Sequence, residues 1–599
     1  MIYHCEDHTC NYWDEGEKLP ERCPQCGRKL LRANEADMTG DDWTALGNTL
    51  WDAEASDKKR MVDCFRKAAY LGSAWGVCNL GICMEQGNGV EADPVQAFWL
   101  YQQAVEMGSL NAVCCLGVCY EYGIGTAPDA KQAAELYCKA AEYGSPRGQM
   151  LLAHAFHDGI GVEADAAEAV YWVRAAAYQR YGEGMHRLGV CYEYGDGVEQ
   201  NWERAVHWFR EAAESGVSAA MTDLGYCYEK GCGVEQSWEQ AFSWYRRGAE
   251  CGYPVSMSNL GLCYKRGYGV DQNWQEAIKW YEQGAQCGDL QSMHNLACCY
   301  ERGEGVEQNE ERALYWYRRS AEGGNGDAMC NLGRCYKRGY GVEQNWQEAV
   351  KWYEQGAQCG NLQSMHSLAY CYERGEGVKQ NMTEAIRWYT AAAEGGNADA
   401  MHNLGWHYDY GEGVEQDMKK AICWYERAAE QNHPAAMNSL GECYAMGLGV
   451  PRDLETAMEW YRRAAELGEA MADYNMGWHL EQAGKLSEAY AHYRKAADGN
   501  DDSAWWALGR FYENGVVVAQ DGKEARRCYE TGEKLGSVKC KMRLARCKLL
   551  GIGGRRAKKA GLDLCRQALE LAKESSEKED YGYEAEMNLL RRTIAENES

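Results

Sequence analysis

Residues 328–360 read AMCNLGRCYKRGYGVEQNWQEAVKWYEQGAQCG, and this stretch decides the fold. In its first half, apolar or small residues keep the i, i+3, i+4, i+7 spacing of one helix face: Met329, Leu332, Gly333 and Tyr336. Gly339 stands where that helix should end, because glycine tolerates the left-handed conformation found just after a helix. The first half therefore predicts one amphipathic helix of about three turns.

The second half predicts another helix, antiparallel to the first. Asn345 should begin it, and Glu348, three residues later, resembles the second member of a capping box. Its buried side should consist of Trp346, Ala349, Val350, Trp352 and Tyr353. Gly356 and Gly360 should close it. One unit is therefore expected to be two helices joined by a Gly-x-Gly-Val turn.

The unit recurs along most of the chain. Eleven Gly-x-Gly frames lie 36 residues apart, at Gly87, Gly123, Gly159, Gly195, Gly231, Gly267, Gly303, Gly339, Gly375, Gly411 and Gly447. A chain of 599 residues would ordinarily divide into about four domains. Because neither helix of a unit can bury its apolar face alone, successive units must stack. The period therefore predicts one all-α solenoid.

The pattern LG-x-CY-x-x-G-x-GV followed by A-x-x-WY-x-x-A-A-E-x-G resembles the Sel-1-like repeat, a relative of the tetratricopeptide repeat. The resemblance covers residues 39–573 in about 14 units, of which residues 73–468 are the most regular. It implies an all-α, right-handed superhelix of helix-turn-helix units. Residues 574–599 are expected to form a helix that caps the stack.

Four cysteines near the start of the chain have metal-ligand spacing. Cys5, Cys10, Cys23 and Cys26 form C-x4-C-x12-C-x2-C. Four thiolates suit tetrahedral Zn²⁺, and a closed set of four ligands indicates a structural role. Residues 1–32 resemble a zinc ribbon or rubredoxin-like knuckle, with His4 or His8 as alternatives to Cys10 and iron as the alternative to zinc. Docking of a partner is the alternative to a purely structural role.

Composition and charge exclude several classes of protein. Lys and Arg total 63 against 90 Asp and Glu, and the net charge of −27 makes the surface as a whole unsuited to nucleic acid or anionic membranes. A hydrophobic content of 46% is too high for a disordered chain. The sequence has no apolar run of about 18 residues and no secretory signal, so we expect no membrane insertion. Together with the thiolate metal site, this predicts a reducing, cytoplasmic location.

Most of the other cysteines are expected to be packing residues. Nine share one phase of the repeat, beside the core tyrosine of the first helix: Cys83, Cys119, Cys191, Cys227, Cys263, Cys299, Cys335, Cys371 and Cys443. A small apolar side chain fits at this position. The Trp-Tyr pairs of the second helices, such as Trp352 and Tyr353, are likewise predicted to be core residues.

The sequence contains no convincing catalytic motif. The Gly-x-Gly frames follow helices and lack GKS or GKT, which a phosphate-binding loop requires. There is no G-x-S-x-G, and the S-x-x-K match at Ser56 and Lys59 has no accompanying SDN or KTG. We therefore predict a non-enzymatic protein.

Side chains 36 residues apart on the first helices should form ladders along one face of the solenoid. One ladder contains His294, His366 and His402, and its neighbour contains Asn295, Asn331 and Asn403. The Asn position resembles the tetratricopeptide position whose amide holds a peptide backbone or a C-terminal carboxylate. Both ladders are candidates for contact with an extended partner, and a solvated polar face is the alternative.

A third ladder is basic. It contains Arg266, Arg302, Arg338 and Arg374, with Arg334 close by. Cations in the last turn of a helix complement its dipole, which is one explanation. The other is a strip for an acidic peptide, carboxylate or phosphate. Tyr370 and Trp406 replace small or polar residues on the same face and are predicted binding anchors.

These ladders predict a scaffold that binds a peptide or protein partner in a concave groove centred on residues 258–410. The basic ladder suits a partner with acidic or carboxylate groups. The alternative is a nucleic-acid-associated regulator that uses the zinc ribbon and the nine Lys or Arg residues within residues 539–559. The sequence does not name the partner, because solenoid grooves change specificity through surface residues alone.

Overall fold

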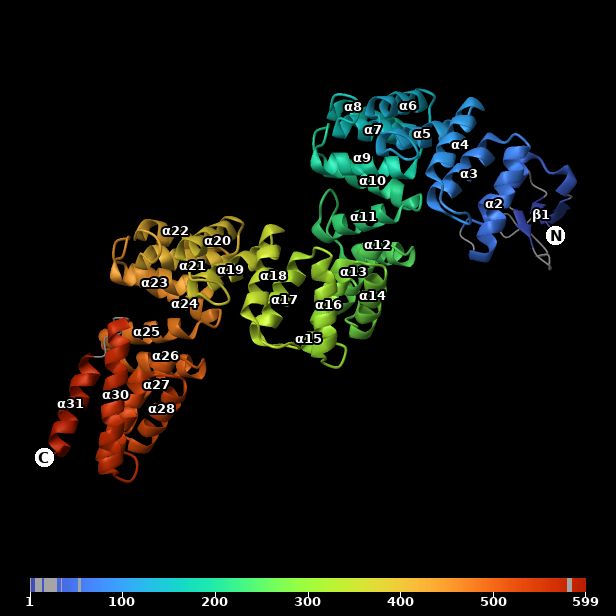
Figure 1. Cartoon of the computed structure of the whole chain (residues 1–599). Helices are drawn as coiled ribbons and strands as arrows, with labels where there is room; N and C mark the ends of the chain where they lie inside the picture. Colours follow the sequence, from blue (N-terminus) through green and yellow to red (C-terminus); the bar gives the residue numbers. More distant parts are fainter. Residues whose placement is uncertain are drawn as a thin grey trace. The chain divides into compact units, whose positions relative to one another are not determined.

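The computed structural model describes residues 2–5, 13–15, 30–33, 35–51, 55–578 and 584–598, and side chains within residues 35–51, 57–573 and 584–597. In this part of the chain, 31 α-helices follow a short three-stranded sheet (Figure 1). Within residues 2–308 and within residues 309–598, consecutive described helices pack on one another, such as α3 (Ala74–Gln86) on α4 (Pro94–Glu106). The prediction of an all-α repeat solenoid is therefore confirmed.

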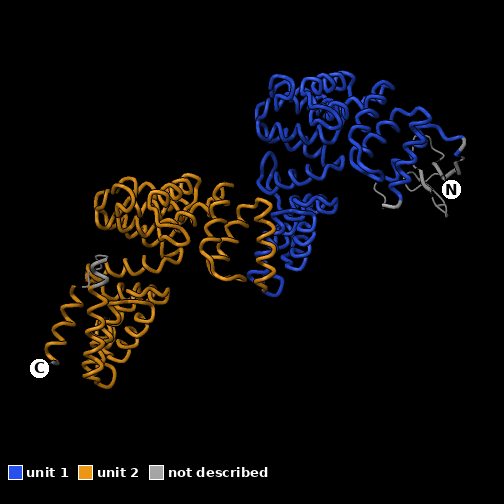
Figure 2. Tube along the Cα trace, in the orientation of Figure 1, with its two compact units in different colours: residues 1–308 blue, residues 309–599 orange. Residues whose placement is uncertain are grey.

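The chain forms two compact units, Met1–Gln308 and Asn309–Ser599 (Figure 2). The first unit contains β1 (Ile2–Cys5), β2 (Trp13–Glu15), β3 (Leu30–Ala33), the 3₁₀ helix η1 (Glu35–Asp37), α1 (Gly40–Thr49), α2 (Ala55–Tyr70), α3, α4, α5 (Leu110–Tyr122), α6 (Ala130–Glu142), α7 (Pro146–Asp158), α8 (Ala166–Tyr178), α9 (Gly182–Tyr194), α10 (Trp202–Glu214), α11 (Ser218–Lys230), α12 (Trp238–Glu250), α13 (Pro254–Arg266), α14 (Trp274–Gln286) and α15 (Leu290–Arg302). The second contains α16 (Glu310–Glu322), α17 (Gly326–Arg338), α18 (Trp346–Gln358), α19 (Leu362–Arg374), α20 (Met382–Glu394), α21 (Ala398–Tyr410), α22 (Met418–Glu430), α23 (Pro434–Met446), α24 (Leu454–Glu466), α25 (Ala470–Gln482), α26 (Leu486–Asp498), α27 (Asp502–Asn514), α28 (Gly522–Lys534), α29 (Val538–Leu550), α30 (Lys558–Lys578) and α31 (Glu584–Glu598).

The residues predicted to end the first helix and to begin the second, Gly339 and Asn345, have these roles in the structure. Gly339 follows α17 with φ 72°, the left-handed conformation that favours glycine. The side chain of Asn345 caps α18 by accepting a hydrogen bond from the backbone N–H of Glu348 at 3.1 Å. The Glu348 carboxylate forms an ion pair with Lys351, so only one half of the expected capping box is seen.

Gly356 has a different role from the one its position in the sequence predicts. It lies inside α18, which continues to Gln358, and does not close the helix. A Cβ atom on Gly356 would lie 2.3 Å from the Oγ atom of Ser364 in the next helix. Glycine is therefore needed here because two helices approach closely, whereas Gly360, with φ 82°, provides the turn.

The core of each unit is built on tyrosine, cysteine and small residues. Tyr317 and Tyr389 are 0% exposed, and the nine cysteines of the common repeat phase are all buried, as predicted. The tryptophans differ from the prediction, because Trp352 and Trp388 are only partly buried. The indole of Trp388 instead carries the guanidinium of Arg387 at 4.4 Å from its ring centroid. These tryptophans lie at the edge of the core.

Three strands at the start of the chain form an antiparallel sheet in the order β2-β1-β3, and β2 lies against α1. Cys10, Cys23 and Cys26 fall outside the described residues, as does the side chain of Cys5. The zinc ribbon expected over residues 1–32 therefore stays a prediction. At the other end, the last turns of α30 and all of α31 lie within residues 574–599, and α31 packs on α29 and α30.

Candidate functional site

The histidine and asparagine ladders connect neighbouring repeats to one another. A side chain on one first helix is hydrogen-bonded to the residue 37 positions later on the next first helix. The pairs are His186 with Asp223 (2.6 Å), Ser258 with Asn295 (3.4 Å), His366 with Asn403 (3.0 Å), His402 with Ser439 (3.4 Å) and Asn438 with Asn475 (3.0 Å). The ladder amides therefore already have protein partners, which a free peptide clamp would not have.

The remaining ladder residues are also engaged. Gln291 Nε2 donates a hydrogen bond to His294 Nδ1 at 3.3 Å, and His294 Nε2 lies 3.6 Å from Cys298 Sγ. Asn331 and Arg334 interact with other described residues as well, and Arg334 lies close enough to the buried Cys330 thiol to influence its pKa. Hydrogen bonds of this kind between repeats could have been predicted from the sequence, because polar residues stand at both positions i and i+37.

Burial keeps two of the ladder histidines neutral. The pKa of His402 is lowered to about 4, first because the ring is desolvated and second because of the charge of His433, whose ring centroid lies 5.1 Å away. Burial likewise lowers the pKa of His366. A neutral imidazole can accept the hydrogen bond that Asn403 donates to His366 Nε2.

The basic ladder is exposed, in contrast to the histidines. Arg266, Arg302, Arg338 and Arg374 are the last residues of α13, α15, α17 and α19. The side chains of Arg302 and Arg374 are 58% and 61% exposed, with loose ion pairs to Glu304 (3.8 Å) and Glu373 (3.7 Å). Arg266 and Arg338 form no hydrogen bond or ion pair with the described residues. Residues 1–308 thus present Arg266 and Arg302 to solvent, and residues 309–599 present Arg338 and Arg374. Each arginine lies at a helix C-terminus, where a cation also complements the helix dipole.

The predicted anchors Tyr370 and Trp406 lie in different surroundings. The Tyr370 ring has Lys337 Nζ at 4.5 Å and Arg374 Cζ at 5.7 Å from its centroid, which brings α17 and α19 together at one aromatic face. Trp406, on α21, is partly buried and packs against Tyr410 at 4.9 Å between centroids. Tyr410 itself is 63% exposed. We call Lys337, Arg338, Tyr370, Arg374, Trp406 and Tyr410 the Tyr370 surface.

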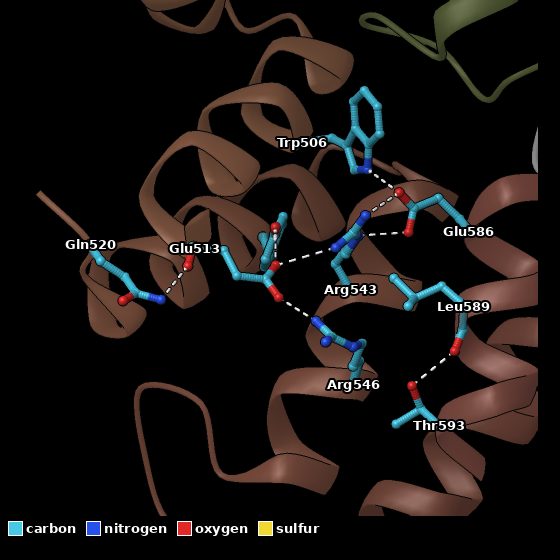
Figure 3. Close-up of polar contacts among 9 residues, drawn as sticks. Trp506, Glu513, Gln520, Arg543, Arg546, Glu586, Leu589 and Thr593 are labelled. Carbon is cyan, nitrogen blue, oxygen red and sulfur yellow. Dashed lines mark hydrogen bonds and ion pairs between the residues drawn. The ribbon is translucent and has the colours of Figure 1, made fainter. Parts of the chain in front are cut away.

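The second basic run, residues 539–559, is largely used for structure. Arg543 donates to Glu586 through Nε and Nη2, both at 2.6 Å, and lies 3.4 Å from Glu513 (Figure 3). Arg546 also pairs with Glu513, and Trp506 Nε1 donates to Glu586 at 3.3 Å. These contacts fasten α31 to α27 and α29. Arg543 and Arg546 are therefore used to hold the C-terminal helix, whereas Arg555 of the same run is exposed.

The sequence patterns overlooked a cavity of about 600 Å³ in the first unit. It lies among α7, α8 and α9, next to Val173, where the other repeats place an aromatic core residue. Comparison of equivalent repeat positions could have found it, because Val173 interrupts the aromatic series. Among the described side chains, there is no group of three or more His, Cys, Asp or Glu residues suited to a metal ion.

None of the helices in the described part of the chain is both long and apolar enough to cross a bilayer. A comparison with curated proteins gives no match. Two solved structures are similar. One is a protective antigen present in uropathogenic Escherichia coli strains displaying an SLR fold, 32% identical over 75% of this chain and 97% of that chain, with a TM-score of 0.50. The other is a Sel1 repeat protein from Oxalobacter formigenes, 32% identical over 41% of this chain and 96% of that chain, with a TM-score of 0.37.

The family description "Sel1 repeat" matches 13 consecutive segments, residues 76–109, 112–145, 146–181, 182–217, 218–253, 254–289, 290–325, 326–361, 362–397, 398–433, 434–469, 470–501 and 504–537. These segments cover most of the chain and coincide with successive helix pairs. Proteins built from such repeats generally serve as scaffolds for protein interactions. The chain belongs to the Sel1-repeat family.

Proposed function

We propose that this chain is a non-enzymatic scaffold that binds an acidic segment of a protein partner on the Tyr370 surface. One observation carries the proposal: two cations lie over the Tyr370 ring, Lys337 at 4.5 Å and Arg374 at 5.7 Å from its centroid. A partly exposed aromatic residue flanked by basic side chains offers a hydrophobic contact and charge-assisted hydrogen bonds at the same place.

The charge of the whole chain makes this surface distinctive. The net charge is −27, yet three of the basic residues here, Lys337, Arg338 and Arg374, are gathered at adjacent helix ends. Arg338 has no ion pair with the described residues, and the pair between Arg374 and Glu373 is long at 3.7 Å. Loose or missing pairs leave these charges available to a carboxylate ligand, because exposed pairs contribute little. Trp406 and Tyr410 supply a second aromatic contact on α21.

Selection of displayed random peptides on the full chain tests the proposal. Peptides enriched in Asp and Glu should be selected, and their affinity should fall as salt rises. The double variant Arg338→Glu with Arg374→Glu should bind the best of these peptides at least about tenfold more weakly, equivalent to about 1.4 kcal/mol. Fluorescence polarisation of the labelled peptide measures the change.

Arg387→Glu is the matched control, because it reverses an exposed charge on a second helix, α20, where Arg387 pairs with Glu384 at 2.7 Å. The control should bind the peptide as the wild type does. Unbiased peptide selection, or equal binding by the double variant with its helical content intact, would contradict the proposal. The nucleic-acid alternative is less favoured, since Arg543 and Arg546 of its basic run are paired with carboxylates.

A further inference from the structure

One position breaks the aromatic core of the solenoid. Residues spaced by 36 from residue 101 to residue 461 are aromatic at every step but one: Tyr101, Tyr137, Phe209, Tyr245, Tyr281, Tyr317, Tyr353, Tyr389, Tyr425 and Tyr461. The exception is Val173 in α8, which is 3% exposed. In the preceding repeat the Tyr137 hydroxyl donates to Glu121 at 2.6 Å, but the residue equivalent to Glu121 is here His157. Both members of the usual pair are therefore replaced.

A cavity of about 600 Å³ lies where the ring would be. Residues of α5, α7, α8 and α9 line it, with α7 packed on α8 and α8 packed on α9. All four helices belong to the first compact unit (Figure 1). Its walls include Met150, Ala153, Val170, Val173 and Cys191. Cavities of several hundred Å³ suit small molecules, and this one combines an apolar wall with many charged and polar side chains. Since the missing group is an aromatic ring, the apolar part of the cavity suits a ring from a ligand.

Two carboxylates of the cavity lining have only neutral partners. Glu121 accepts its hydrogen bond from the Tyr137 hydroxyl, and Glu183 accepts one from the Tyr181 hydroxyl at 3.1 Å. Neither forms an ion pair with the described residues. The other two lining carboxylates differ, because Asp158 and Asp196 each lie within ion-pair distance of His157. Glu121 and Glu183 therefore leave negative charge unmatched at the cavity.

Two arginines of the same lining form no ion pair within 4 Å among the described residues, although the pKa of Asp158 is lowered first by its hydrogen bond with His157 and also by the charge of Arg187. Arg147 Nη1 donates only to the Cys115 thiol, at 3.5 Å. Arg187 forms no hydrogen bond or ion pair with the described residues. Both arginines are partly buried, and a buried charge without a counter-charge is costly. Arg187 stands at the ladder position that Asn295 and Asn403 occupy in other repeats. This repeat therefore has a cation where the other two have an amide that forms a hydrogen bond to the neighbouring repeat.

We propose that this cavity binds a free aromatic α-amino acid. The ring of the ligand lies against Val173, its ammonium group meets Glu121 and Glu183, and its carboxylate meets Arg147 and Arg187. The lining offers carboxylates to an ammonium group and guanidinium groups to a carboxylate, so a zwitterion meets both kinds of charge, whereas a ligand of one sign meets only one. This binding site is separate from the Tyr370 surface, and neither proposal depends on the other.

Isothermal titration calorimetry on the full chain with L-phenylalanine and L-tyrosine tests the proposal. Both should bind. N-acetyl-L-phenylalanine has lost the ammonium group and L-phenylalaninamide has lost the carboxylate, so each should bind at least about tenfold more weakly. These two compounds also mimic the C-terminal and the N-terminal residue of a peptide. Equal or tighter binding of either one would assign the cavity to a peptide end and overturn the proposal.

Variants locate the binding. His157→Glu with Val173→Tyr restores the usual tyrosine-carboxylate pair, fills the cavity and should abolish binding while the chain stays folded. Phe209→Tyr makes the matching change in the next repeat, where Glu193 occupies the carboxylate position, and should bind as the wild type does. Arg187→Gln should weaken L-phenylalanine and N-acetyl-L-phenylalanine more than L-phenylalaninamide. Failure of the wild type to bind either amino acid, or retained binding by the folded double variant, would overturn the proposal.

Discussion

Each core tyrosine ends in a hydroxyl that needs a partner, and the residue 16 positions earlier in the chain usually provides it. Tyr245 donates to Glu229 at 2.9 Å, and Tyr389 donates to Glu373 at 2.7 Å. At Tyr281 the equivalent residue is Lys265, which pairs instead with Glu304 at 3.0 Å. The Tyr281 hydroxyl is buried with no hydrogen-bond partner among the described residues. The same core position thus occurs with and without its polar contact.

This difference predicts opposite effects of the same substitution. Tyr245→Phe should lower the local unfolding free energy by about 1–2 kcal/mol, because it removes a hydrogen bond to a carboxylate and leaves Glu229 partly buried without it. Tyr281→Phe should leave the stability unchanged or raise it, since it removes a buried hydroxyl that has no partner. Hydrogen exchange with mass spectrometry over α12 and α14 measures both. Equal losses in the two variants would contradict the argument.

The last helix shows how an element is fastened without belonging to a helix pair. Glu586 on α31 has a side chain only 7% exposed and accepts hydrogen bonds from Arg543 on α29 and Trp506 on α27. Met587 and Leu590 of the same helix are buried beside these contacts. The docking of α31 therefore depends on one buried ion pair together with a small apolar cluster.

We expect Glu586→Ala to release α31. Removing one partner of a buried ion pair costs about 3 kcal/mol or more, because Arg543 keeps only its longer contact with Glu513. Backbone amides of residues 584–598 should then exchange much faster, while α13 and α17 remain protected. Asp563→Ala is the control: it breaks an exposed pair with Arg566 at 3.6 Å and should change exchange by less than about 0.5 kcal/mol. Unchanged protection of α31 would show that the apolar cluster alone holds it.

At the scale of the whole molecule, most of the fold could be predicted from the 36-residue period of the sequence. The 36-residue spacing, the asparagine and glycine caps, and the buried tyrosines and cysteines were predictable because each is a local signal repeated many times. Partners far apart in the sequence were not. The pairing of Arg543 with Glu586 spans 43 residues and lies outside the period, so the basic run resembled a free surface. The cavity beside Val173 arises where one repeat departs from the aromatic pattern. A search for residues that recur in every repeat does not detect such a departure.

Because each repeat of the solenoid contacts only its neighbours, we expect that removing a metal ion from the N-terminal cysteines does not destabilise the distant repeats. Four cysteines at metal-ligand spacing, Cys5, Cys10, Cys23 and Cys26, predict about one zinc ion per chain. Elemental mass spectrometry of the full chain should detect zinc, and Cys23→Ser with Cys26→Ser should remove it. Cys251→Ser with Cys287→Ser, two exposed solenoid cysteines, should retain it. Because each repeat contacts only its neighbours, chelation should leave the thermal unfolding of the solenoid unchanged. Metal that survives the Cys23 and Cys26 substitutions would contradict this ligand set, and iron in place of zinc would identify a rubredoxin-like site.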